Sequence, residues 1–255
     1  MKKTLIVLMG LMMMVLAAAG CGGEKKAADA PKVLKVGTEP TFAPFEFQKE
    51  GSKEYDGFDM DLIRAIGKQL NMKVEIQNMG FDALIPAINA GNIDVAAAGM
   101  SITPERQKAV DMSDPYYVSG LVVVVNKDNM ITKSVKDLDN KSIATQIGTT
   151  GAERAAKVPG AKVKTFNTNT EAFLELKNKG VEAVIIDKPV AEYYLAQGGQ
   201  STAKIVGDTM EAESYGLSLK KGSPLTKQIN KALSDLKKNG EYDIIYKKWF
   251  GEVKK

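Results

Sequence analysis

The 255-residue sequence contains no histidine and a single cysteine, Cys21. The absence of histidine excludes a Ser-His-Asp triad, a Cys-His nucleophile pair and a histidine-ligated metal site. One cysteine can form neither an internal disulfide nor a thiolate metal cage. The 35 Lys and Arg nearly balance the 31 Asp and Glu, and they are interspersed, so the clustered basic charge of a nucleic-acid-binding protein is also missing. We expect no metal, no cofactor and no nucleic-acid partner.

Long hydrophobic runs are missing except near the start of the chain. There Lys2 and Lys3 precede an apolar run from Leu5 to Leu16, and small residues follow it. The run is shorter than the ~20 residues that a transmembrane helix needs, so residues 1–20 have the layout of a secretory signal peptide. The remaining length suits one large domain or two of roughly 100 residues each.

The segment that ends at Cys21, Leu-Ala-Ala-Ala-Gly-Cys, resembles the lipidation site of bacterial lipoproteins. Ala18 stands where leucine is usual, so a plain signal peptidase site beside an incidental cysteine is the alternative. Residues 21–31 are small or charged and lack periodicity, which is typical of a flexible tether. A lipidated Cys21 would anchor the folded part to the outer face of the cell membrane, outside the cytoplasm.

From Val33 onward, short apolar runs alternate with amphipathic stretches, which predicts parallel sheets flanked by helices. In the first half we predict strands at 33–36, 73–76 and 93–97 and helices at 59–70 and 82–89. After an apolar strand at 121–125, we predict strands at 142–145, 162–166 and 182–186 and helices at 151–157, 170–179 and 189–197. The last predicted elements are a strand at 216–219 and helices at 224–239 and 241–250.

This order of elements predicts an α/β fold of two lobes, each a mainly parallel sheet flanked by helices. If the last strand and helices pack on the first lobe, lobe 1 comprises residues 32–115 and 216–255, and lobe 2 comprises residues 121–210. The chain then crosses between the lobes twice, at 116–120 and 211–215. Two crossovers form a natural hinge, and a small ligand would bind in the cleft between the lobes.

Ligands of open parallel sheets bind at the carboxyl ends of the strands, so polar and aromatic residues just past each strand are candidate site residues. In the first half these are Glu39, Phe42, Phe81, Gly99, Ser101 and Arg106. In the second half they are Gln146, Thr149, Thr150 and Asp187. From the sequence, residues such as Phe42 and Phe81 are more often part of the hydrophobic core than stacking faces for a ligand.

The segment Ser101-Ile-Thr-Pro-Glu-Arg106 is the most informative of these. Thr103 and Pro104 predict the start of a helix, which places Arg106 in the first turn, where the helix dipole disfavours a cation by ~0.3 to 1 kcal/mol. A bound carboxylate would compensate, because charge-assisted hydrogen bonds are worth ~1.5 to 3 kcal/mol each. The alternative is a surface ion pair of Arg106 with Glu105, Asp111 or Asp114.

Three other features have competing interpretations. The turn Gly148-Thr149-Thr150-Gly151 offers hydroxyls and amides to the cleft, although such turns are commonly structural, and it lacks the glycine patterns of nucleotide-binding loops. Asp187 ends an apolar strand, where its carboxylate needs a cation, either a ligand ammonium or Lys188. Asp59 lies near Asp56 and Asp61, a trio that could suggest a calcium site, but their spacing is not that of an EF-hand. We expect Asp59 to cap the helix that follows.

Five separated motifs occur in a recognisable order: GTEPTFAPFEF from Gly37, GFDMDL from Gly57, GFDALIPAINAGNIDVAAAGMSITPERQKAVDMSDPYY from Gly80, SVKDLDNKSIATQIGTTG from Ser134, and EYDIIYKKWFG near the end. Together they resemble the polar amino-acid-binding proteins of ABC importers, from about Lys32 to Lys254. The resemblance implies the type II periplasmic binding protein fold, a free polar L-amino acid as ligand, a membrane permease as partner and a monomeric state.

The resemblance also implies how the two charged groups common to amino acids are bound. The α-carboxylate would contact Arg106 and the backbone at Ser101 and Thr150. The α-ammonium would contact Asp187, the Gly99 carbonyl and the Ser101 hydroxyl.

The ligand side chain would lie between Phe42 and Phe81, with Glu39 at its polar end. Relative to the glutamine-binding protein, Glu39 replaces Asp, Gln146 replaces Lys and Ile186 replaces His. A carboxylate without an opposing cation favours a basic amino acid, and the Gln146 region is similar to arginine- and lysine-binding members. Glutamine is the alternative, because Glu39 can also accept a hydrogen bond from a carboxamide.

Two other functions are compatible with the resemblance. Some relatives of similar fold are dehydratases of cyclic dicarboxylates, for which Glu39 is the candidate general acid, but the cations for a second substrate carboxylate are missing. The other possible function is the extracellular sensor domain of a signalling protein. Such a protein needs a transmembrane helix and an output domain, and we expect neither after Lys255. We therefore predict a transport receptor and not an enzyme.

Overall fold

A computed structural model of the protein describes residues 32–49, 51–210 and 212–251. The predicted signal peptide, Cys21 and the tether at 21–31 lie outside the described residues. Within the described ranges, no helix is both long enough and apolar enough to cross a membrane.

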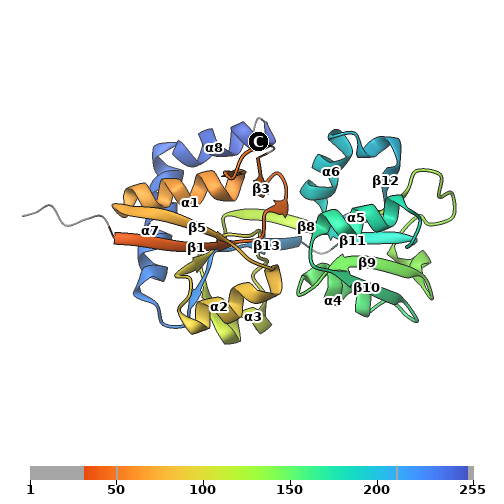
Figure 1. Cartoon of the computed structure of the whole chain (residues 1–255), viewed down its shortest axis with the longest axis horizontal. Coiled ribbons are helices and arrows are strands. Elements are labelled where there is room, and N and C mark those ends of the chain that lie inside the picture. The colour runs from red at the N-terminus through yellow and green to blue at the C-terminus, as the bar shows by residue number, and fades with distance from the viewer. Residues whose placement is uncertain (1–31, 50, 211, 252–255) are drawn as a thin grey trace, which may run out of the picture. The chain divides into compact units, whose positions relative to one another are not determined.

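Helices and strands alternate along the chain (Figure 1). The strands are β1 (Lys32–Thr38), β2 (Thr41–Phe42), β3 (Glu46–Gln48), β4 (Tyr55–Asp56), β5 (Met72–Asn78), β6 (Val95–Ala96), β7 (Val110–Met112), β8 (Tyr117–Asn126), β9 (Ser142–Gln146), β10 (Lys162–Phe166), β11 (Ala183–Asp187), β12 (Ala203–Val206), β13 (Ala212–Tyr215) and β14 (Ser218–Lys220). The helices are α1 (Phe58–Gln69), α2 (Leu84–Ala90), α3 (Pro104–Ala109), α4 (Thr150–Ala156), α5 (Asn169–Lys177), α6 (Lys188–Ala196), α7 (Pro224–Asn239) and α8 (Glu241–Phe250). Short 3-10 turns are η1 (Phe81–Ala83), η2 (Val135–Leu138) and η3 (Gly199–Ser201).

Each lobe is built on one mixed sheet. In lobe 1 the strand order is β5-β1-β6-β14-β7, with β1 parallel to both β5 and β6 and β14 antiparallel to β6 and β7. In lobe 2 the order is β10-β9-β11-β8-β12, with β9 parallel to β10 and β11 and β8 antiparallel to β11 and β12. The strands expected to be parallel within each half are parallel, and the antiparallel strands make both sheets mixed.

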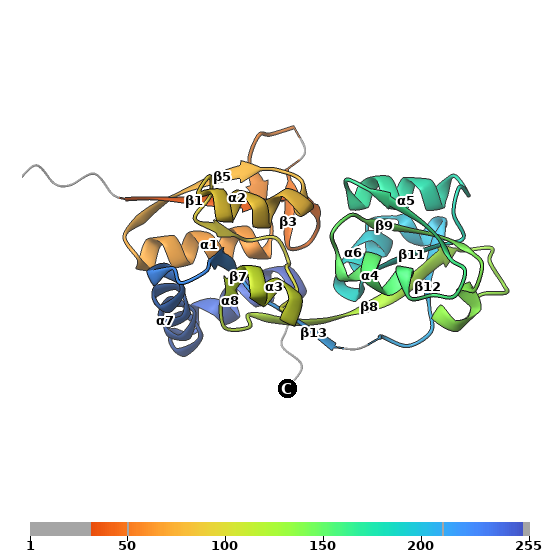
Figure 2. The ribbon, with the colours of Figure 1, turned by 90° about the horizontal axis from the view of Figure 1, so that it is seen from below.

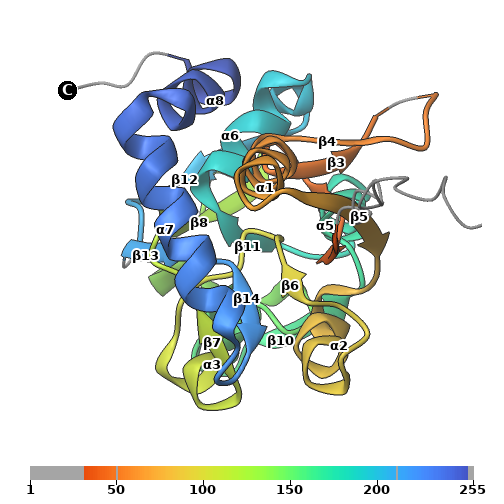
Figure 3. The same ribbon diagram turned by 90° about the vertical axis from the view of Figure 1, so that its left-hand side faces the viewer.

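Helices cover both faces of each sheet because the central strands are apolar on both sides. In β8, Leu121, Val123 and Val125 pack in the cluster that includes α4, whereas Val122 and Val124 pack in the cluster that includes α5 and α6. Figure 1 shows α4 below this sheet and α5 and α6 above it. In lobe 1, α1, α7 and α8 lie on one face and α2 and α3 on the other (Figure 3).

Two antiparallel strands connect the lobes. β8 and β13 pair over their whole common length, with Tyr117 opposite Tyr215 and Gly120 opposite Ala212 (Figure 2). These are the segments expected to cross between the lobes. Their action as a hinge stays a prediction.

An aromatic cluster packs lobe 1 against these connecting strands. Phe58, at the start of α1, is fully buried. Its ring centroid lies between 5.3 and 6.2 Å from six other ring centroids, those of Phe45, Tyr116, Tyr117, Tyr242, Tyr246 and Phe250. The cluster joins α1 and α8 to the residues where the chain leaves lobe 1.

Replacing Phe58 by alanine should lower the free energy of unfolding by ~3 to 5 kcal/mol, because it removes a fully buried ring and leaves a cavity. The matched control is Ile244→Ala on α8, where the side chain is 71% exposed and the loss should be below ~0.5 kcal/mol. Urea denaturation followed by circular dichroism measures both. Equal losses would contradict the placement of Phe58 in the core.

Candidate functional site

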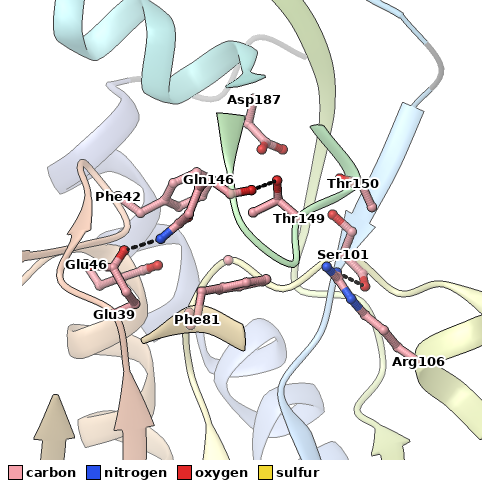
Figure 4. A pocket seen from close by; sticks show the side chains of 12 residues that line it. Glu39, Phe42, Glu46, Phe81, Ser101, Arg106, Gln146, Thr149, Thr150 and Asp187 are labelled. Carbon is pink, nitrogen blue, oxygen red and sulfur yellow. Dashed lines mark hydrogen bonds between the residues drawn. The ribbon is translucent and has the colours of Figure 1, made fainter. Parts of the chain in front are cut away.

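A small pocket lined by residues of both lobes lies between them (Figure 4). The structure brings all of the sequence-predicted site residues together around it. They are Glu39, Phe42, Phe81, Gly99, Ser101, Arg106, Gln146, Thr149, Thr150 and Asp187, joined by Glu46 and Ala98, which the sequence analysis did not propose.

Strand topology explains why residues so far apart in sequence meet here. Glu39 directly follows β1, Phe81 begins η1 after β5, and Ser101 lies beyond β6. Gln146 and Asp187 are the last residues of β9 and β11. The carboxyl ends of the parallel strands of both sheets therefore face the same pocket, as expected for ligand sites of open sheets.

Arg106 enters the pocket from the first turn of α3. The Thr103 side chain caps this helix by accepting from the Arg106 N–H at 3.2 Å, and Pro104 is its first residue, as predicted. Arg106 is 8% exposed, and its Nη1 and Nη2 donate to the carbonyls of Ser101 at 2.8 Å and of Gly148 at 3.0 Å. Because Gly148 belongs to lobe 2, the guanidinium already spans the two lobes.

The surface alternative for Arg106 is not formed. Glu105 pairs with Lys108 at 2.6 Å, and Asp111 pairs with Lys221 at 3.5 Å. The guanidinium carbon instead lies 5.3 Å from the centre of the Phe81 ring, within the range of a cation–π contact. Burial lowers the pKa of Arg106, but a guanidinium stays protonated in proteins. The pocket therefore contains a buried positive charge without a paired carboxylate at contact distance among the described residues.

Asp187 enters the pocket from the opposite lobe. Its Oδ1 accepts from Ser119 Oγ at 3.1 Å and from Tyr215 Oη at 2.5 Å, so both connecting strands hold it. Burial raises the pKa of Asp187 to about 7, against the lowering effect of the Tyr215 hydrogen bond. Lys188 is not its partner, because Lys188 Nζ lies instead 3.8 Å from Glu192 Oε1. The carboxylate points into the pocket (Figure 4).

A carboxylate and a carboxamide meet across the lobes at the other end of the pocket. Glu39 Oε2 accepts from Thr41 Oγ1 at 2.7 Å and from Gln146 Nε2 at 2.8 Å (Figure 4). Gln146 Nε2 also donates to the Asn167 carbonyl at 3.0 Å, and its Oε1 accepts from Asn169 Nδ2 at 2.8 Å. These partners fix the amide with its nitrogen toward Glu39. Burial raises the pKa of Glu39, and its two side-chain hydrogen bonds oppose the shift.

Phe42 and Thr149 line the pocket and also have structural roles. Gly99 has a positive φ of 51°, and a Cβ there would lie 2.5 Å from the Phe42 ring, so only glycine fits beneath the ring. The Thr149 hydroxyl donates to the Gln146 carbonyl at 2.8 Å and accepts from the Ala152 N–H at 3.2 Å. It therefore acts as the N-cap of α4.

Glu46 is a pocket residue that the sequence analysis missed. It is 1% exposed, and burial, followed by the nearby carboxylates of Asp59 and Glu39, raises its pKa well above the ordinary value. Glu46 Oε2 and Asp59 Oδ1 are both buried and have no other hydrogen-bond partner among the described residues, so a protonated Glu46 can donate to Asp59. The available signal was its position between Phe45 and Phe47, an unusual place for a charged residue.

The expectation that Asp59 caps α1 is wrong. The N-cap residue is Gly57, and Asp59 is fully buried in the first turn of the helix. Its Oδ2 accepts from the Gly99 N–H at 2.9 Å and from Tyr116 Oη at 2.6 Å. Burial raises the pKa of Asp59 to about 6, although these hydrogen bonds favour the charged form.

Glu213 is a second carboxylate that the sequence analysis did not assign to the site. It lies on β13, and its Oε2 accepts from Ser101 Oγ at 2.6 Å and from Thr150 Oγ1 at 2.8 Å. One hydroxyl comes from each lobe. The residue was missed because the sequence pattern placed 211–215 in a connection without revealing its pairing with β8.

The chain belongs to the family of bacterial extracellular solute-binding proteins, family 3, whose model matches residues 34–252. It is 34% identical over 256 residues to the arginine-binding extracellular protein ArtP of Bacillus subtilis, covering 98% of each chain.

Solved structures of this fold are also similar. An ancestral arginine-binding protein bound to arginine is 48% identical, with a TM-score of 0.83 over 86% of this chain and 98% of that chain. An ancestral amino-acid-binding protein described as a precursor of cyclohexadienyl dehydratase is 41% identical, with a TM-score of 0.79 over 86% and 95%. The two-lobed type II periplasmic binding protein fold is thereby confirmed.

The buried carboxyl groups predict how the stability of the free protein depends on pH. The folded chain keeps a proton on Asp187 up to about pH 7, whereas the unfolded chain releases it near the ordinary aspartate pKa of 3.8. Raising the pH from about 5 to 8 should therefore lower the free energy of unfolding, by up to ~3 kcal/mol for Asp187 alone.

Urea denaturation at several pH values measures this slope. Asp187→Asn should reduce it, because asparagine does not titrate, and the other buried carboxyl groups with raised pKa values should keep part of it. Glu105→Gln is the control, since Glu105 is exposed and should leave the slope unchanged. A stability that rises across this pH range, or an unchanged slope in Asp187→Asn, would contradict the prediction.

Proposed function

We propose that the protein is an extracytoplasmic receptor that captures a polar L-amino acid between its lobes and delivers it to an ABC importer. The placement of Arg106 and Asp187 on one pocket, from opposite lobes, carries the proposal. An amino acid presents a carboxylate and an ammonium on the same carbon, so one ligand can neutralise both buried charges. The guanidinium offers a bidentate partner to the carboxylate, and Asp187 accepts from the ammonium.

Capture of this kind links ligand binding to closure of the lobes. A ligand shifts a conformational equilibrium only as far as it binds one state better than the other. Arg106 and Asp187 can both reach one amino acid only when the lobes are together, so the ligand favours the closed form. A dissociation constant near 1 μM requires ~8 kcal/mol, a plausible sum for two charged contacts and aromatic burial after ordering costs.

For the ligand side chain we propose a basic amino acid, with glutamine as the second candidate. In this proposal the ligand α-carboxylate pairs with Arg106 and its α-ammonium with Asp187. Glu39, at the far end of the pocket, is then left for the ligand side chain (Figure 4). A buried carboxylate is costly without a cation, and a guanidinium or ammonium supplies one. The carboxamide of glutamine could donate to Glu39 but would leave its charge unpaired. The similarity to arginine-binding relatives supports the same choice.

We also propose that lipidation of Cys21 tethers the receptor, as a monomer, to the outer face of the membrane beside its permease. The signal-peptide pattern of residues 1–20 and the tether composition of 21–31 support this part of the proposal.

A dehydratase is the second candidate function, favoured by the likeness to the ancestral precursor of cyclohexadienyl dehydratase. The buried carboxyl of Glu39, with its raised pKa, has the character of a general acid. However, Arg106 is the one cation among the residues that line the described pocket, so a second substrate carboxylate would lack a partner. This imbalance favours a binding protein.

Arg106→Ala should abolish ligand-induced stabilisation of the mature protein. In a thermal-shift panel of the twenty amino acids, a ligand at ~100 times its dissociation constant adds ~2.7 kcal/mol to the stability of the wild type. Arg64→Ala is the matched control, because Arg64 is exposed on α1 and bonds the Tyr55 carbonyl away from the pocket. An undiminished thermal shift in Arg106→Ala would contradict the proposal that Arg106 binds the ligand carboxylate. A wild type that no amino acid stabilises would contradict the proposed function.

Glu39→Gln should separate the two ligand candidates. It removes the charge but keeps an oxygen acceptor, so arginine should lose roughly tenfold or more in affinity, whereas glutamine should change by only a few fold. Calorimetric titration measures both, with the exposed Glu54→Gln as control. Equal losses for the two amino acids would contradict the assignment of Glu39 to a cationic side chain.

A further inference from the structure

We propose that Glu213 is a positioning residue that turns the hydroxyls of Ser101 and Thr150 into acceptors for the ligand α-ammonium. The inference rests on the proposed function and deepens it. It assigns a role to a residue outside the pocket lining and fixes the direction of two hydrogen bonds within the pocket.

Glu213 accepts two hydrogen bonds on one oxygen atom. A single oxygen, Oε2, lies 2.6 Å from Ser101 Oγ and 2.8 Å from Thr150 Oγ1. Both hydroxyls donate to this carboxylate oxygen. Each hydroxyl has only one hydrogen and two lone pairs, and its remaining capacity is therefore that of an acceptor.

The hydroxyls of Ser101 and Thr150 can therefore accept hydrogen bonds from a ligand. Ser101 and Thr150 line the same pocket as Arg106 and Asp187, and Figure 4 shows them next to each other on the Arg106 side of the pocket. A carboxylate placed against two acceptors would be repelled, whereas an ammonium with three N–H groups can donate to them. The α-ammonium is thereby directed to Asp187 and the two hydroxyls, and the α-carboxylate is left to the Arg106 guanidinium.

Glu213 lies behind the pocket wall. Its side chain lines a separate, outer hollow together with Glu153 and Arg154 of α4. Thr150 lines both this hollow and the ligand pocket, so it forms part of the wall between them. Glu213 thus acts on the ligand through the hydroxyls that it holds.

Glu213 joins one hydroxyl of each lobe to the connecting strand β13. Ser101 belongs to lobe 1, Thr150 starts α4 in lobe 2, and Glu213 lies on the connecting strand β13. Two residues further along β13, Tyr215 donates to Asp187. One short strand therefore orients three of the groups that surround the proposed ammonium position, and the pair of hydroxyl acceptors forms only when the lobes are together.

The test compares amino acids with analogues that lack the α-amino group. Binding of L-arginine, L-glutamine and their two desamino analogues is measured for the wild type, Glu213→Ala and Glu213→Gln. Glu213→Ala should weaken the amino acid that the wild type binds by roughly tenfold or more, because the hydroxyls are released to donate elsewhere. The desamino analogue should change by less than about threefold, and Glu213→Gln, which keeps an oxygen acceptor, should be intermediate.

Glu153→Gln is the matched control. Glu153 lines the same outer hollow and lies close enough to Arg106 to affect its pKa, but no hydrogen bond joins its carboxylate to Ser101 or Thr150 within the described structure. It should leave the ratio of amino-acid to desamino affinity unchanged. Circular dichroism verifies that the variants fold.

Three results would contradict the role of Glu213. Equal losses of affinity for the amino acid and its desamino analogue would show that Glu213 only supports the pocket wall. Unchanged affinity for the amino acid in Glu213→Ala would show that Glu213 does not position the hydroxyls for the ligand. A loss in Glu153→Gln as large as in Glu213→Ala would assign the effect to charge alone. If the wild type binds neither arginine nor glutamine, the basic-or-glutamine ligand assignment fails first, which is a result distinct from the other three.

Discussion

Two buried aspartates hold the tyrosine hydroxyls that flank the strands connecting the lobes, and the geometry of the pocket depends on them. Asp59 in lobe 1 accepts from Tyr116, and Asp187 in lobe 2 accepts from Tyr215. Burial raises the pKa of the first to about 6 and of the second to about 7, so both carboxylates are costly to keep charged. The same hydrogen bonds that reduce this cost also fix where the chain leaves one lobe and enters the other.

The two aspartates differ in what their second oxygen faces. Each accepts its two hydrogen bonds on a single oxygen. The other oxygen of Asp59 is buried and can accept only from a protonated Glu46, whereas Asp187 points into the pocket. The second oxygen of Asp187 is therefore available to the ligand. An ammonium bound there would lower the pKa of Asp187 and recover part of its desolvation cost, which gives ligand binding a direct effect on the residue that Tyr215 holds.

Local signals in the sequence predicted local structure well. The caps and periodicity around Thr103, Pro104 and Pro224 placed the starts of α3 and α7, and the strand-end rule gathered Glu39, Arg106 and Asp187. The errors arise where a partner is distant in sequence. Asp59 bonds Gly99 and Tyr116, 40 and 57 residues away, and the Ser101 to Glu213 hydrogen bond spans 112 residues. Capping rules cannot reveal such partners. Glu46 begins β3, and the strands β2, β3 and β4 have only two or three residues each, too few to show periodicity, so Glu46 was missed.

The arrangement assigns different parts of recognition to different residues. Arg106, Asp187 and the hydroxyls held by Glu213 surround the end of the pocket proposed for the α-groups, which every amino acid shares. Glu39 and Gln146 meet at the opposite end, where amino acids differ. Because Glu39 belongs to lobe 1 and Gln146 to lobe 2, the residues proposed to choose the side chain also bridge the lobes. A ligand side chain that competes for their hydrogen bond must replace that bridge, so selectivity and closure depend on the same contact. Substitutions at this end can change the preferred side chain while the groups that bind the amino-acid backbone stay in place.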